Sequence, residues 1–138
     1  MSNENPERRL RIIYRLARGT VAGVWIYSGL VPKVLFRDWS EMTLLRESGV
    51  DTPLLPYVTN SVGFLEILFG LATLVLWKRH WPLWMTVGVM AGALISVAQH
   101  SPRMLHAAFN PVTTNGMLIV LALVALWAGA ALAEKQQS

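Results

Sequence analysis

Two ionisable residues stand inside apolar stretches, where a charge is costly unless it has a partner. Glu66 lies in the apolar run 62–70, near the middle of its predicted helix. We expect it to face a bundle interior, either as a neutral group donating one interhelical hydrogen bond or as a contact for a proton, ligand or metal. Lys33 either snorkels to the headgroups or is turned inward by a kink at Pro32. Glu66 is its obvious internal partner, although counting along the helices places it about 10 Å deeper.

Further polar residues gather near the start of the last predicted helix. Asn110 precedes Pro111 and is expected to cap that helix, while Asn115 projects about one turn into the membrane, where its amide needs partners. His100 and His106 are separated by a proline and do not have the i, i+4 spacing of a metal pair on a straight helix. We therefore predict no metal site, and we expect interfacial histidines in preference to haem ligands.

Composition narrows the classes of function. Of 138 residues, 54% are hydrophobic and 14% are charged, and the charged ones fall at the N-terminus and in short connections. This is the composition of a membrane protein. The absence of cysteine excludes disulfides, cysteine nucleophiles and cysteine-ligated clusters, so a redox role would need a borrowed cofactor. Membrane topology explains the net charge of +4 better than binding to nucleic acid does.

Apolar segments of nearly 20 residues, the length that crosses a bilayer, recur along the chain. They predict helices over residues 12–36, 57–77, 81–100 and 111–133. The second and third are joined by residues 78–80 alone, so we expect them to be antiparallel neighbours. The fold class predicted for residues 1–138 is a single all-α membrane domain, a bundle of four transmembrane helices.

The distribution of charge predicts the orientation of the chain in the membrane, and a capping pattern predicts a short surface helix. Eight Lys and Arg residues belong to one side of this bundle and four to the other, which favours cytoplasmic N- and C-termini in a bacterial inner membrane. In the first outer connection, Asp38 and Glu41 have the spacing of a capping box, and Gly49 supplies a stop. These residues predict a short interfacial helix.

One face of the helix at 81–100 carries small residues. Gly88, Gly92, Ser96 and His100 recur every four residues and form a stripe. Such a stripe lets helix backbones approach closely, so helix packing is one interpretation. The other is a slot for a flat or chain-like lipophilic ligand.

Three short motifs follow one another along this topology. They are Gly29-Leu30-Val31-Pro32-Lys33, then Gly63-Phe64-Leu65-Glu66 with Gly70, and Phe109-Asn110-Pro111-Val112-Thr113-Thr114-Asn115. In this order, and over nearly the whole chain, they resemble the DoxX-like family of small four-helix bacterial membrane proteins. The resemblance implies a membrane bundle and, among relatives, an association with redox systems that includes a subunit of thiosulfate:quinone oxidoreduction. More distant members resemble assembly chaperones, so the fold leaves the function open.

From these residues we expect a polar pocket in the outer half of the bundle, reached from the periplasm or laterally from lipid. The residues predicted to bind the ligand there are Lys33, Glu66, His100, Asn110 and Asn115. The ligand would be an amphipathic molecule such as a quinone or a lipid, because carbonyl or phosphate oxygens match Lys and Asn donors. Expected partners are membrane lipid, a redox enzyme or another membrane protein, and a second copy of the chain.

The competing hypothesis makes the protein a non-enzymatic membrane subunit or assembly factor. It would then use the small-residue stripe and the outer surface helix against a protein partner. The sequence leaves open whether the chain is an enzyme.

Overall fold

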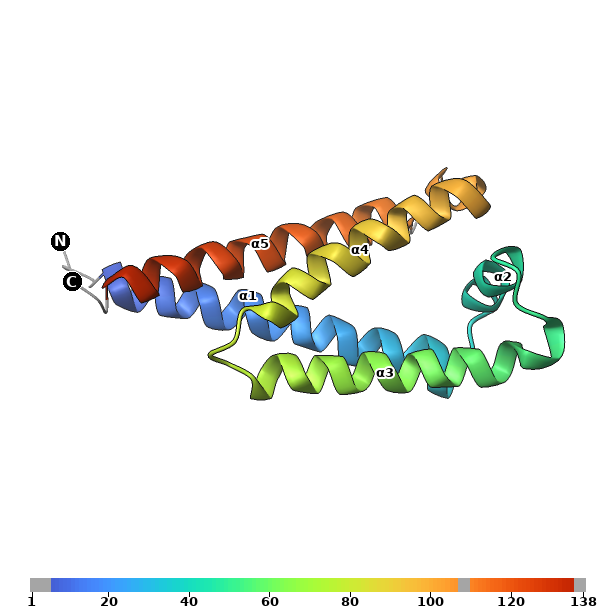
Figure 1. Cartoon of the computed structure of the whole chain (residues 1–138), viewed down its shortest axis with the longest axis horizontal. Helices are drawn as coiled ribbons and strands as arrows, with labels where there is room; N and C mark the ends of the chain where they lie inside the picture. The colour runs from blue at the N-terminus through green and yellow to red at the C-terminus, as the bar shows by residue number, and fades with distance from the viewer. Residues whose placement is uncertain (1–5, 107–109, 136–138) are drawn as a thin grey trace.

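The computed structural model of the chain describes residues 6–106 and 110–135, and every regular element in these ranges is a helix. In chain order they are α1 (Pro6–Gly29), which continues as η1 (Leu30–Leu35), α2 (Trp39–Glu47), η2 (Thr52–Leu54), α3 (Leu55–Val75), α4 (Trp81–His100), η3 (Pro102–His106) and α5 (Pro111–Lys135). The bundle is elongated, with the start of α1 and the end of α5 at one end and α2 at the other (Figure 1). The predicted all-α class and surface-helix segment are confirmed.

The long helices have the length and composition of membrane spans. By these criteria Thr52–Val75, Trp81–His100 and Pro111–Lys135 can each cross a bilayer, while Pro6–Leu35 reaches the same standard only together with α2, from which it is bent by 91°. Large apolar side chains point outward from these helices, for example Val75, which is 79% exposed. An apolar exterior is what contact with acyl chains requires.

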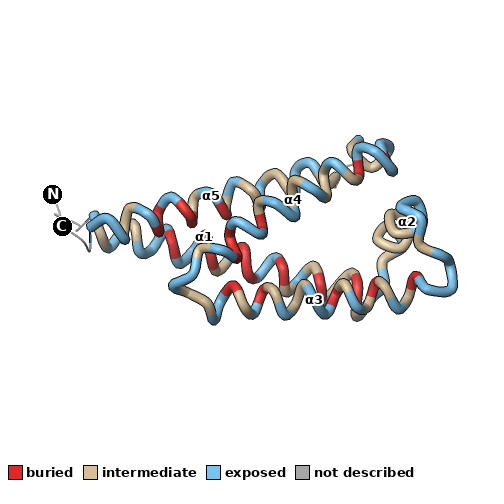
Figure 2. The backbone as a smooth tube through the Cα atoms, viewed as in Figure 1, coloured by how far each residue is buried: buried red, intermediate tan, exposed pale blue. Residues whose placement is uncertain are grey.

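Helix α1 is the element around which the others are arranged. It packs along both α3 and α5, and α4 packs on α5, so that buried residues follow α1 and the facing sides of α3 and α5 (Figure 2). Helices α3 and α4 are antiparallel and in contact, as the short hinge predicts, but they contact each other at few positions (Figure 1). Trp25 of α1 lies between them. Its Nε1 donates to Thr86 of α4 over 3.0 Å, and its ring meets Phe69 of α3 at 4.9 Å between centroids.

Arg18 fastens α1 to the end of α3. The side chain is fully buried, and no carboxylate touches it within the described residues. Its guanidinium donates hydrogen bonds of 2.6–2.9 Å to the carbonyl oxygens of Thr73, Leu76 and Arg79 and to the hydroxyl of Tyr14. The last carbonyls of a helix have no partner within the helix, so Arg18 caps α3 from a neighbouring helix.

The small-residue stripe of α4 faces away from the rest of the chain. Gly88 and Gly92 are exposed, and a Cβ added at either would meet nothing within 4 Å. Packing of this stripe inside the bundle, the first interpretation of its spacing, is therefore wrong for the described residues. The close helix contact lies elsewhere, between α1 and α3, where a Cβ at Gly70 would come within 2.6 Å of Ile26.

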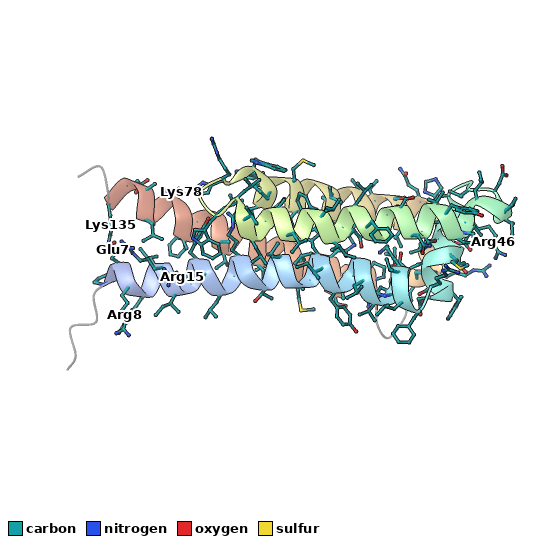
Figure 3. The ribbon with its side chains drawn as sticks, turned by 90° about the horizontal axis from the view of Figure 1, so that it is seen from below. Glu7, Arg8, Arg15, Arg46, Lys78 and Lys135 are labelled. Atoms are coloured by element: carbon teal, nitrogen blue, oxygen red, sulfur yellow. The ribbon has the colours of Figure 1, made fainter. Side chains whose placement is uncertain are left out.

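Replacing Arg18 with Met tests the cap. We expect the free energy of unfolding in detergent to fall by about 2–4 kcal/mol, because the carbonyls at the end of α3 lose buried donors. Arg8→Met is the control, since Arg8 is exposed on the same helix (Figure 3) and its replacement should change stability by no more than about 0.5 kcal/mol. Equal unfolding midpoints for the two variants in a denaturant titration would contradict the assignment.

Candidate ligand-binding cleft

Lys33 is positioned by a change of helix type at the C-terminal end of α1. In η1 the amide of Phe36 donates to the carbonyl of Val31, five residues back, over 3.0 Å, which is the π-helical pattern. Pro32 within this segment has no N–H to donate, so the regular α-helical bonding cannot continue. The side chain of Lys33 is only 8% exposed. It is turned into the protein, so the alternative with an inward ammonium holds and snorkelling does not.

The ammonium of Lys33 lies between two carboxylates from different helices. Its Nζ is 3.1 Å from Oε2 of Glu66 in α3 and 3.3 Å from Oε2 of Glu41 in α2. Glu66 is therefore paired directly with Lys33 inside the bundle, which residue counting along the helices had left open. Within the described residues Glu66 Oε2 receives no well-aligned hydrogen bond, so the contact is ionic and leaves room for a further donor.

Two glycines let Lys33 and Glu66 come together. Helices α1 and α3 touch at Gly29 and Gly63, where a Cβ on Gly29 would lie 2.3 Å from the carbonyl oxygen of Gly63 and a Cβ on Gly63 would lie 2.7 Å from that of Gly29. The same added atoms would press on the charged residues, at 3.0 Å from Glu66 Cβ and 2.9 Å from Lys33 Cβ respectively. Because neither glycine has a side chain, α1 and α3 approach closely enough for Lys33 to reach Glu66.

Gly63→Ala tests this contact. We expect the added methyl group to push α1 from α3 and to lower the free energy of unfolding by about 1–3 kcal/mol, because the clash is with backbone that cannot rotate away. Gly92→Ala is the matched control on α4, where open space surrounds the added atom and the greater helix propensity of alanine should leave stability equal or higher. Thermal unfolding of both variants in one detergent gives the comparison, and a loss shared by both would refute it.

Helix α2 closes the end of the bundle away from the termini. It contacts both η1 and the residue that follows α4. Asp38 caps it as predicted, accepting a 2.9 Å hydrogen bond from the amide of Ser40. Glu41 was expected to complete a capping box, but its carboxylate contacts Lys33 instead. At the other end of α2, Glu47 accepts a hydrogen bond from the buried hydroxyl of Ser101, which follows α4.

These elements enclose a cleft of about 730 Å³. Its polar end contains Lys33, Glu41 and Glu66, and its walls are mostly apolar. The apolar lining comes from several helices and includes Val24, Trp25, Val62, Met90, Val97, Leu118 and Leu121. A volume between about 300 and 1,000 Å³ with a few convergent polar groups is typical of small-molecule sites. Among residues 6–106 and 110–135, no three His, Asp or Glu side chains gather as metal ligands would.

The cleft brings together three of the five residues predicted to bind a ligand. Lys33, Glu66 and Asn115 line it. Asn110 does not, and its side chain instead accepts from the amide of Thr113 over 2.9 Å, which is the predicted cap. His100 is exposed outside the cleft, with Nδ1 2.9 Å from the carbonyl of Ser96 one turn earlier.

The sequence did not predict the contacts that Glu41 and Arg18 make in the structure. Glu41 was assigned to local capping, although its place one turn after the bend at residues 36–38 also turns it toward Lys33. For Arg18 the sequence predicted only that either it or Lys33 would lie within reach of lipid, whereas the structure buries both, and Arg18 completely. A cation flanked by apolar residues on both sides is the signal that could have marked it.

Comparison of the sequence with known protein families gives a match. The sequence model of the DoxX-like family matches residues 22–123. The chain belongs to the DoxX-like family. The match covers both DoxX-like glycine motifs that bring Lys33 to Glu66, and the third motif as well, of which Phe109 lies outside the described residues. No match to this DoxX-like protein was found among curated proteins or solved structures.

Proposed function

We propose that this DoxX-like membrane protein binds a lipophilic small molecule in the outer cleft, with a quinone head group preferred over a lipid, and that it does so as a membrane subunit of a redox system. The observation that carries the proposal is the charged cluster of Lys33, Glu41 and Glu66 at the end of a mostly apolar cleft. Structural stability alone does not require a cleft beside a buried ion pair.

The cluster has hydrogen-bonding capacity left for a ligand. An ammonium has three protons, and its ion pairs with two carboxylates can engage at most two of them, so at least one remains to donate to a carbonyl oxygen. Glu66 can accept from a hydroxyl, as in a reduced quinone, and Asn115 adds an amide to the lining. With two carboxylates around one cation, a neutral carbonyl suits the cluster better than a phosphate does.

The apolar walls of the cleft suit the hydrocarbon tail of a quinone or lipid. An isoprenoid or acyl tail leaving the charged end would lie along Val62, Met90 and Leu121, which belong to three different helices. Because α3 and α4 have little contact, the tail can pass between them to the lipid. Burial of each methylene against such walls contributes about 0.8 kcal/mol.

Extraction of the purified protein tests the proposal. The protein is isolated in mild detergent, and organic extracts are quantified by mass spectrometry for quinones and lipids per mole of protein. Lys33→Met and Glu66→Gln should each lower the retained ligand about tenfold or more, because each removes a charge-assisted hydrogen bond. The controls are Arg46→Met and Glu134→Gln, which change the same kinds of charge at exposed positions outside the cleft. Wild-type amounts of ligand in both cleft variants would refute the proposal.

A second candidate function rests on a different observation. Gly88 and Gly92 form a bare strip on the outside of α4, and Trp39 of α2 is 73% exposed. Both features suit a membrane-protein partner in an assembly or scaffolding role. In the same purification, this function would give a stoichiometric protein partner that is lost in Gly92→Leu and Trp39→Ala, with no quinone or lipid held by the cleft.

We further propose that the cleft opens toward the periplasm of a bacterial inner membrane, with both termini in the cytoplasm. Basic residues are concentrated at the end opposite α2, as the labelled side chains in Figure 3 illustrate. An excess of Lys and Arg on short cytoplasmic segments is the general rule for orientation.

Single cysteines give the orientation without background, because the natural chain has none. We expect Ser48→Cys, just after α2, to react with a membrane-impermeant maleimide in intact cells with the outer membrane permeabilised. Lys78→Cys in the hinge should react only after the inner membrane is opened. The reverse pattern would invert the proposed topology.

A further inference from the structure

A second hollow lies at the end of the molecule opposite the outer cleft. It has a volume of about 450 Å³ and is formed by the beginning of α1, the hinge between α3 and α4, and the last turns of α5. Its lining includes Arg11, Arg15 and Lys78 together with the rings of Tyr14, Trp77 and His80. We call it the basic hollow. None of the residues that line it belongs to the outer cleft.

The floor of the basic hollow is fixed by aromatic contacts. The hydroxyl of Tyr14 donates to the carbonyl of Trp77 over 2.6 Å, and the two rings meet edge to face at 5.3 Å between centroids. His80 lies 6.4 Å from Tyr14, centroid to centroid. A Cβ at Gly129 of α5 would come within 3.0 Å of both Tyr14 and His80, so the wall is closely packed and preformed.

The electrostatic character of the basic hollow is strongly positive. Arg15 and Lys78 are exposed at the rim and make no ion pair within residues 6–106 and 110–135, whereas Arg11 is paired with Glu7 one turn earlier. Behind the floor, Arg18 contacts Tyr14 and three carbonyls, all of them neutral groups. Its charge is therefore solvated by the protein but not neutralised, and it adds to the potential in front of it.

The residues around the basic hollow are of the kinds expected at the level of the headgroups. It lies where the spans α3 and α4 meet, beside Trp77, and Trp81 follows within one turn. Tryptophan and basic residues are characteristic of the level between acyl chains and water, and basic pockets between membrane helices bind anionic headgroups. The headgroup of a lipid at this level can contact the cations of the basic hollow while its acyl chains stay in the membrane.

We propose that the basic hollow binds the phosphate of an anionic phospholipid such as phosphatidylglycerol, with Arg15 and Lys78 as the phosphate donors and the rings of Trp77 and Tyr14 beneath its glycerol. The bound group is a phosphodiester, and the acyl chains stay in the leaflet. This site is independent of the ligand proposed for the outer cleft.

Lipid titration of the delipidated full-length protein tests the basic hollow. The protein in detergent is titrated with phosphatidylglycerol or phosphatidylcholine, and native mass spectrometry counts the bound molecules. We expect phosphatidylglycerol to bind in preference to phosphatidylcholine, and the double variant Arg15→Gln, Lys78→Gln to bind it about 30-fold more weakly. The charge-preserving variant Arg15→Lys, Lys78→Arg should stay within about threefold of the natural protein, which separates lost binding from lost folding.

Three controls make the result specific. The double variant Arg46→Gln, Arg103→Gln removes the same charge from exposed residues of α2 and η3, outside the basic hollow, and should bind phosphatidylglycerol normally. Arg37→Gln, which removes one more exposed cation outside both hollows, should do so as well. Inorganic phosphate at millimolar concentration should not compete. Equal losses in the two glutamine double variants, equal binding of the two lipids, or full competition by inorganic phosphate would each overturn the proposal.

Discussion

A lysine ammonium inside a membrane protein is costly unless it is paired, and the half of this bundle that carries α2 is built around that constraint. Lys33 meets Glu66 only because α1 and α3 approach until backbone touches backbone at Gly29 and Gly63. The turn of η1 then directs the ammonium inward, and α2 brings Glu41 to its other side. The cleft exists because the helices that carry these charges are held together on one side and diverge from α4 on the other.

At the opposite end, the chain buries a second cation by a different solution. Arg18 has no carboxylate in contact within the described part of the chain and is satisfied by helix-end carbonyls and a tyrosine hydroxyl. A guanidinium presents five donors in a plane, which suits several carbonyls at once, whereas an ammonium is a compact point charge that favours carboxylates. The choice of Arg in one place and Lys in the other follows the acceptors that each must satisfy.

The sequence predicted the features that depend on local pattern. Helix positions, the cap at Asp38, the stop at Gly49 and the inward direction of Glu66 follow from apolar length, capping chemistry and the cost of burying charge. The sequence did not predict which face each helix turns toward its neighbours, because that depends on the rotation of one helix against another. The same spacing of small residues gives a contact at Gly63 and an exposed strip at Gly92, and no periodicity distinguishes them. For that reason Lys33, Glu66 and Asn115 reached the cleft, while His100 turned outward and Glu41 was assigned to a cap.

Helix α2 is tied at two points, Glu41 to Lys33 and Glu47 to Ser101, which belong to opposite arms of the bundle. Glu47 lies six positions after Glu41, a rise of about 9 Å along a helix, so the length of α2 between the two contacts sets the width of the opening. Inserting one residue between them would rotate the second tie by about 100° and release it. The width of the opening therefore depends on the length of α2, and a change in that length would change what fits in the cleft below it.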